Sequence, residues 1–253
     1  MYRVILAFCF FTAFQAKSQL VNVESMRMHT DSVRVAGNAS CSFSYQENNA
    51  VSLLVLKASM AAQFKSKSLK DIFMVIGNTD FTKTAGTELS NSAFGHFRYN
   101  RKFNSFFRWE VFTQVQYNKL LSVGMRWLNG TGPRLKWIHK ENAACYFGSL
   151  YMFEYEETSG FDNLINRNHR LSNYLTLSFS FPKIKGEFVS TTYFQPRVDK
   201  WNDFRLMQQT SMAFNITQKV KLITGFSFLY DAFPPLGVNQ KALSFDQGIR
   251  IDL

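Results

Sequence analysis

The chain has 253 residues, of which 46% are apolar and 19% charged, and its 29 Lys and Arg against 18 Asp and Glu give a formal net charge of +11. The 16% aromatic content supplies enough apolar surface for a folded core and excludes an intrinsically disordered chain. The mean hydropathy of −0.16 is not that of a helical membrane protein. Alternating strands average to such a value whether their apolar face meets a core or lipid, so both kinds of β protein remain open.

The N-terminus has the three-part order of a secretory signal peptide. Arg3 precedes an apolar run over residues 4–14, and small and polar residues follow it. A small-x-small pattern ends at Ser18, which predicts cleavage near Ser18/Gln19 and removal of residues 1–18. The apolar run is too short to span ~30 Å of hydrocarbon as a helix, which disfavours an uncleaved anchor. We therefore expect an exported protein.

The mature chain stays basic. Loss of Arg3 and Lys17 with the signal peptide lowers the net charge from +11 to +9. A basic balance is often a sign of nucleic-acid binding, but exported chains rarely meet nucleic acid and no run of five or more Lys or Arg is present. A nucleic-acid partner is therefore not expected.

Period-two alternation recurs along the rest of the chain and predicts strands. In residues 107–117 the apolar face carries Trp109 and Val111, and the opposite face carries Glu110 and Gln114. The same rule predicts about twelve strands, at residues 33–46, 51–64, 70–81, 91–102, 106–118, 120–138, 143–156, 169–181, 186–197, 204–217, 219–231 and 242–253. An even number is expected for a single-chain outer-membrane barrel.

The C-terminal strand alternates up to Leu253, as is typical of outer-membrane barrels, although a terminal aromatic residue is more usual. We expect this strand to be the contact for the barrel-assembly machinery. Several connections are long, at Thr82–Ser90, Glu157–Asn168 and Ala232–Lys241, and most of those at the opposite end are short. This asymmetry between the two ends is typical of outer-membrane barrels.

The strand length favours a membrane barrel over a soluble sandwich. The predicted strands are mostly 11–14 residues long, whereas strands in globular proteins centre on about 5–6. Residues 33–253 are therefore predicted to form a closed, antiparallel, transmembrane β-barrel of about twelve strands in the bacterial outer membrane, in contact with its lipid. Residues 19–32 show no strand pattern and are expected to be a periplasmic tail or a short plug entering the lumen.

A family resemblance covers most of the mature chain. The segments FGHFRYNRKFNSFFRWEVFTQVQYNKL, GTGPR, YMFEYE, HRLSNYL, STTYFQPRVDKWNDFR and FLYDAFPP resemble a domain-of-unknown-function family described as salt-induced outer-membrane proteins. The resemblance implies an outer-membrane β-barrel with no established activity. It implies no functional residues.

Projecting the alternation inward predicts a charged lumen. The candidates are Arg98, Arg108, Glu110, Arg126, Glu154, Arg205 and Arg250. A network of paired charges that stiffens a narrow barrel is the favoured interpretation, because an unpaired buried charge is costly. The alternative is a polar conduit for small ions or solutes, in which the excess of Arg would favour anions.

The sequence carries no catalytic, cofactor or metal signature. None of the four His residues has a metal-ligand spacing. His169 with Ser172 is the nearest match to a hydrolase pair, at the level of chance. Gly130–Pro133 lacks the residues of a phosphate-binding loop and is interpreted as a bulge or bend. The expected function is a non-enzymatic structural or narrow-channel role. The alternatives are an outer-membrane enzyme acting on lipid or lipopolysaccharide, and a soluble periplasmic β-sandwich or lipocalin-like binder.

Overall fold

The computed structural model describes residues 22–24, 33–48, 51–84, 87–159, 164–182, 184–217 and 220–251. The predicted signal peptide at residues 1–18 lies outside these residues, as does the segment 19–32 apart from residues 22–24. In the described part of the chain no helix is long and apolar enough to cross a membrane.

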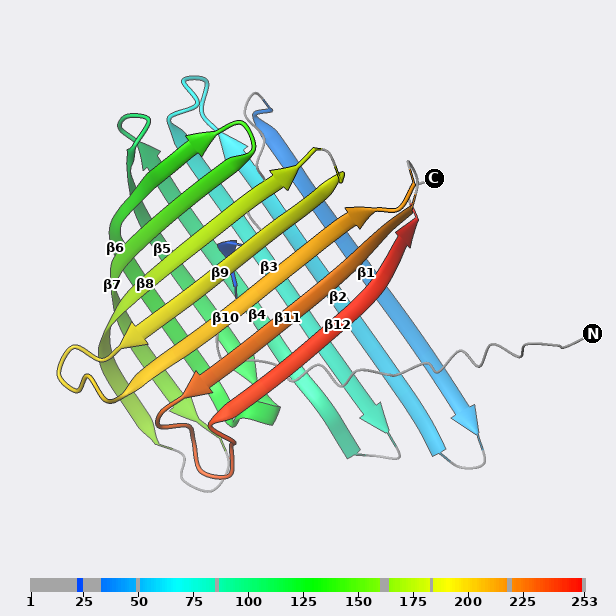
Figure 1. Cartoon of the computed structure of the whole chain (residues 1–253). Coiled ribbons are helices and arrows are strands. Elements are labelled where there is room, and N and C mark those ends of the chain that lie inside the picture. The colour runs from blue at the N-terminus through cyan, green and yellow to red at the C-terminus, as the bar shows by residue number, and fades with distance from the viewer. Residues whose placement is uncertain are drawn as a thin grey trace, which may run out of the picture.

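Twelve antiparallel strands follow one another in chain order within a single sheet (Figure 1). They are β1 (Val35–Asn48), β2 (Val51–Lys65), β3 (Asp71–Thr84), β4 (Thr87–Lys102), β5 (Phe107–Asn118), β6 (Val123–Lys140), β7 (Ala143–Thr158), β8 (Ile165–Phe181), β9 (Gly186–Pro196), β10 (Phe204–Asn215), β11 (Val220–Asp231) and β12 (Lys241–Ile251). All twelve predicted strands are present. The largest differences are at β4 and β8, which begin four residues earlier than predicted. The connection expected at Thr82–Ser90 is therefore mostly strand, and the one expected at Glu157–Asn168 is shorter.

The two edge strands of the sheet are β1 and β12. Among the described residues β1 pairs with β2 alone, and β12 with β11 alone. The structure thus confirms one antiparallel sheet of twelve strands, while its closure into a barrel stays a prediction.

The alternation of side chains divides the sheet into a concave and a convex face. On β5, Trp109 and Val111 are 40% and 44% exposed on the convex face, whereas Glu110 and Phe112 are buried on the concave face. This is the division predicted from the sequence. The concave face carries buried polar and charged side chains beside apolar clusters that include Phe112, Leu150 and Met74, and the convex face carries large apolar side chains.

Strand β6 departs from the predicted pattern at its start. Leu121 belongs to the 3₁₀ turn η2 (Lys119–Leu121) and not to the strand. Val123 is buried, because a register shift between Val123 and Met125 reverses its facing relative to Met125. The bulge expected at Gly130–Pro133 is wrong: the register of β6 is continuous there, and its other shift lies between Lys136 and Ile138.

Glycines on the concave face of β6 and β7 lie beneath aromatic rings of neighbouring strands. Gly130 pairs with Phe112, and Gly148 pairs with Tyr174. A Cβ atom on either glycine would lie 2.2 Å from that ring, so the close approach requires Gly. The two glycines thereby make room for the rings on the concave face.

A buried charge network as the candidate functional site

The concave face holds two groups of buried ion pairs. The central cluster comprises Glu24, Arg98, Glu110 and Arg134. The mouth cluster comprises Arg126, Glu154, Glu156, Arg170, Asp203, Arg205 and Asp231. Every member of both clusters is at most 5% exposed.

The central cluster joins three adjacent strands through Glu110 of β5. Its carboxylate accepts hydrogen bonds from Arg98 of β4 at 3.2 Å and from Arg134 of β6 at 3.3 Å. Asn100 donates to the same carboxylate at 2.6 Å, and the hydroxyl of Tyr174 donates at 2.7 Å. Tyr174 lies on β8, so this bond spans the concave side between strands that are not neighbours in the sheet.

Residues 22–24 complete the central cluster from outside the sheet. They form the short dark-blue segment against the concave face in Figure 1. One oxygen of the Glu24 carboxylate lies 2.8 Å from Arg98, and the other lies 2.8 Å from Arg134. Val23 packs into an apolar cluster with Ala61, Met74, Ile76 and Phe94. The segment is therefore anchored by charge and by apolar contact.

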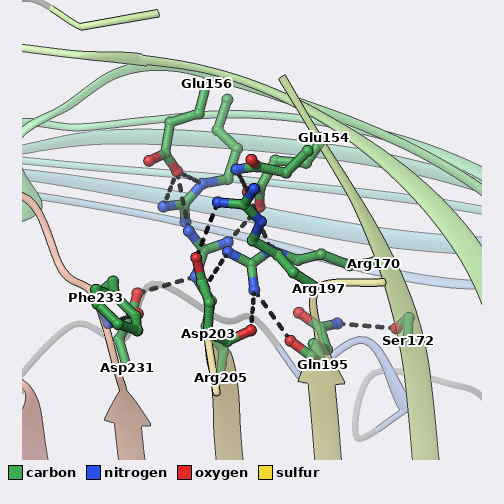
Figure 2. Close-up of polar contacts among 12 residues, drawn as sticks. Glu154, Glu156, Arg170, Ser172, Gln195, Arg197, Asp203, Arg205, Asp231 and Phe233 are labelled. Atoms are coloured by element: carbon green, nitrogen blue, oxygen red, sulfur yellow. Dashed lines mark hydrogen bonds and ion pairs between the residues drawn. The ribbon is translucent and has the colours of Figure 1, made fainter. Parts of the chain in front are cut away.

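The mouth cluster lies at the end of the sheet that carries the connections after β9 and β11 (Figure 2). Arg205 of β10 contacts three carboxylates: Glu154, Glu156 at 3.3 Å and Asp231 at 2.9 Å. Arg170 of β8 contacts Glu154 at 3.1 Å and Asp203 at 2.9 Å. The remaining pair joins Arg126 of β6 to Glu156.

The mouth cluster continues into the β9–β10 connection through Arg197. Its guanidinium contacts Asp203 at 3.2 Å and donates two hydrogen bonds to Asp199, at 2.6 and 3.1 Å. These bonds hold the pKa of the exposed Asp199 carboxyl below its ordinary value. A pocket of about 330 Å³ beside the cluster is lined by Glu156 and by residues 233–236 of the β11–β12 connection.

The structure brings together five of the seven predicted lumen residues. Arg98 and Glu110 lie in the central cluster, and Arg126, Glu154 and Arg205 lie in the mouth cluster. Arg108 belongs to neither cluster, and its guanidinium carbon lies 5.9 Å from the centre of the Tyr146 ring. Arg250 lies on β12, and its side chain is outside the described part.

Six cluster members were not predicted, and they fall into two kinds. Arg134, Glu156, Arg170 and Asp231 lie on predicted strands, on the concave face. Extending the alternation along those strands would have found them. Glu24 and Asp203 lie outside strands, so a period-two rule contains no signal for either.

The predicted excess of lumen Arg is wrong for these clusters. The central cluster pairs two Arg with two Glu. The mouth cluster pairs three Arg with four carboxylates, and the adjoining pair of Arg197 with Asp199 adds one charge of each sign. The acids missed from the sequence thus offset the Arg residues within the two clusters.

The side chains considered for catalysis lie on opposite faces of β8. The ring of His169 hydrogen-bonds the hydroxyl of Tyr151 at 2.5 Å, and both side chains are exposed on the convex face. Ser172 is buried on the concave face and accepts a hydrogen bond from Gln195. Among the described residues no group of three or more His, Cys, Asp or Glu is placed to hold a metal ion.

Polar side chains on the convex face bond to one another. The indole N–H groups of Trp109 and Trp127 donate to the hydroxyls of Thr131 and Thr113, at 2.9 and 3.0 Å. On β9 and β10, the amide of Gln208 donates to hydroxyls on both strands at 2.7 and 3.0 Å. These groups therefore have hydrogen-bond partners that do not depend on water.

Fold and site together define an all-β protein: one curled antiparallel sheet with ion pairs buried on its concave side. The chain belongs to the family described as protein of unknown function, DUF481, whose profile matches residues 56–247. This confirms the resemblance seen in the sequence. No curated protein matches the chain.

Two solved structures are similar over most of the chain. A NanC porin has a TM-score of 0.47 and 11% identity, and the match covers 87% of this chain and 98% of the porin. A bacterial polysaccharide outer-membrane secretin has a TM-score of 0.46 and 6% identity, with 85% of this chain and 80% of the secretin covered.

Proposed function

We propose that this protein is an outer-membrane β-barrel of the bacterial envelope, with a structural role and a lumen closed by its ion-pair clusters. The observation that carries the proposal is the inverted polarity of the sheet. Buried side chains include eight Arg and Glu residues of the strands, and the exposed ones include Phe97, Trp109, Trp127 and Tyr151. A water-soluble sheet buries its apolar face, whereas a barrel in lipid exposes it.

The convex face meets the second requirement of hydrocarbon, which is that polar groups be satisfied within the protein. Its Trp and Gln side chains donate to hydroxyls of adjacent strands. Its apolar side chains lie along the middle of long strands, such as Val111 and Val115 of the twelve-residue β5. Lipid is therefore the partner proposed for this face.

Closure of the sheet by pairing of β1 with β12 is part of the proposal. An open edge in hydrocarbon would leave backbone N–H and C=O groups without partners. With an even number of strands in a meander, β1 and β12 run antiparallel, as such pairing needs. β1 is exposed on both faces along almost all of its length, whereas Ala242, Ser244 and Asp246 of β12 are half-buried, and closure would cover the concave sides of both strands. β12 is also proposed as the strand that the assembly machinery binds.

The lumen is proposed to be too well filled for steady conduction. The interior of a barrel of about eight strands has room for side chains alone, whereas sixteen-stranded porins hold an aqueous channel. Here the clusters and residues 22–24 occupy the space on the concave side, and bonds such as Tyr174 to Glu110 cross it. Residues 22–24 are proposed to act as a short plug. Passage of small ions would require these contacts to open.

No catalytic activity is proposed. An enzyme acting on lipid or lipopolysaccharide would need a nucleophile and a base within hydrogen-bond reach, and His169 and Ser172 point to opposite faces. The sandwich form of the soluble alternative also finds less support. A sandwich packs two sheets face to face, and the described strands belong to one sheet.

The test is membrane fractionation followed by gel mobility of unheated and boiled samples. The proposal expects the protein in the outer-membrane fraction, with a mobility that changes only on boiling, because a closed barrel resists the detergent until heated. A product in the soluble periplasmic fraction, with one mobility in both samples, would refute the proposal and favour the binder.

A further inference from the structure

We propose that Arg98 and Arg134 form a binding site for the carboxylate of a small solute, and that Glu24 occupies this site as an internal ligand. The site is defined by two guanidinium groups on strands β4 and β6, which are 4% and 0% exposed. The folded protein itself forms the site, so this proposal does not depend on whether the lumen conducts.

The geometry is that of a carboxylate held between two donors. Each oxygen of Glu24 meets a different guanidinium at 2.8 Å, which is the length of a charge-assisted hydrogen bond. The bonds from the same two Arg residues to Glu110 are longer, at 3.2 and 3.3 Å. Glu110 has further donors in Asn100 and Tyr174, so it is the fixed acid of the cluster.

The charges require an anion at the position of Glu24. Without it, two guanidinium groups would face Glu110 alone, and one buried positive charge would lack compensation. Burying such a charge is strongly unfavourable. Any small carboxylate that reaches the two Arg residues would relieve this cost, since it offers the same two oxygens.

Arg134 also has hydrogen-bond donors that Glu24 does not use. Its Nε and Nη2 atoms are buried and have no hydrogen-bond partner, while its guanidinium carbon lies 4.2 Å from the centre of the Tyr146 ring. This cation–π contact with the aromatic ring helps to hold the guanidinium in place. The donor set therefore exceeds what Glu24 uses, as expected of a site that takes other carboxylates.

Glu24 differs from the other cluster acids in where it lies along the chain. Glu110 and Glu154 belong to strands held by ladder hydrogen bonds on both sides. Glu24 lies outside the sheet, and Val23 anchors it by apolar packing. Glu24 is thus the acid that can be exchanged for a solute without breaking the sheet.

The test replaces the Glu24 side chain by free acetate, which matches the fragment that Glu24→Ala removes. Folded Glu24→Ala protein in detergent is titrated with sodium acetate against sodium chloride of equal ionic strength at pH 7. Acetate is expected to bind saturably by calorimetry and to raise the thermal unfolding midpoint, and chloride is not. Adding Arg134→Gln should weaken acetate binding about tenfold or more, the effect of losing one charge-assisted hydrogen bond.

Two controls separate a specific site from general salt effects. Glu24→Gln keeps the volume filled, so acetate should neither bind nor stabilise it. Asp199 forms two hydrogen bonds with Arg197 in an exposed pair, and Asp199→Ala removes its carboxylate. Acetate is not expected to bind saturably at that exposed position. Equal responses to acetate and chloride, or equal acetate binding by all variants, would overturn the proposal.

If Glu24→Ala does not fold in either salt, a second variant tests the same site. Val23→Ala weakens the apolar anchor but keeps the Glu24 carboxylate, so acetate should compete with it. Binding of acetate to Val23→Ala above the level of the unmodified protein supports the site, and no increase refutes it. Failure of the fractionation test alone would leave this result standing.

Discussion

A charge placed on the convex face should separate a lipid-facing sheet from a soluble one. Val111 is 44% exposed and lies near the middle of β5, between Tyr99 of β4 and Thr131 of β6. The twelve residues of β5 extend about 40 Å, which at a tilt of about 45° covers about 28 Å of the bilayer normal. Val111 therefore lies close to the bilayer midplane.

Val111→Arg should lower the free energy of unfolding in lipid by about 2–4 kcal/mol, the cost of Arg on the lipid face at this depth. The control is Gln209→Arg on the concave face, where Gln209 pairs across the ladder with the fully buried Thr191. Gln209 is half-buried, so an Arg side chain there can extend toward water and should cost less than about 1 kcal/mol. Gln114 is a poorer control than the alternation suggests, because it is buried and bonded to His96 and Gln116.

The assay is reversible denaturant titration of each variant in lipid vesicles. If Val111→Arg were as stable as the unmodified protein, within about 0.5 kcal/mol, the position would face water, as an exposed site on a soluble sheet does. If Gln209→Arg proved the costlier change, the two faces would be assigned the wrong way round. Either result would refute the argument from inverted polarity.

Three further predictions test the concave face. Arg205→Ala leaves three carboxylates without this partner and should destabilise the fold by about 3–5 kcal/mol, measured by the same titration. Gly148→Ala places a Cβ atom 2.2 Å from the Tyr174 ring and should cost about 1–3 kcal/mol, whereas Gly95→Ala meets nothing within 4 Å and should change stability by less than about 0.5 kcal/mol. Equal effects of the two Ala variants would contradict the packing argument. The unmodified protein should show little steady current in planar bilayers and Arg126→Ala should raise it; an unchanged current in the variant would show that the mouth cluster does not close the lumen.

Strand count, order and facing were predictable from the sequence because each depends on a local rule. Alternation at Trp109 and Val111 against Glu110 identifies both the strand and its two faces, since side-chain direction has a period of two. The rule failed at β6, where the shift between Val123 and Met125 reverses the facing. A bulge depends on how two strands pair, so it cannot be predicted from the alternation within one strand.

Gly130 and Gly148 show a second limit of the sequence. The sequence suggested a bulge or bend at Gly130, but in the structure Gly130 and Gly148 both leave room for rings from adjacent strands. Which aromatic residue lies over which glycine depends on register across the sheet. The Tyr174 hydroxyl reaches Glu110 as a result, and that contact joins residues far apart in the chain.

The charge balance of the concave face depends most on the residues that alternation cannot find. Counted on the predicted strand positions alone, Arg exceeds Glu and the lumen looks like an anion path. Glu24, which lies outside the strands, brings the central cluster to balance, and Asp203, also outside the strands, adds a fourth carboxylate to the three Arg of the mouth cluster. Because an unbalanced buried charge is costly, Arg98 and Arg134 need a second acid beside Glu110, and the strands do not supply it. An acid supplied by a segment outside the ladder is held less firmly than one within it, so the balance at Arg98 and Arg134 is the part of this face that a solute can take over.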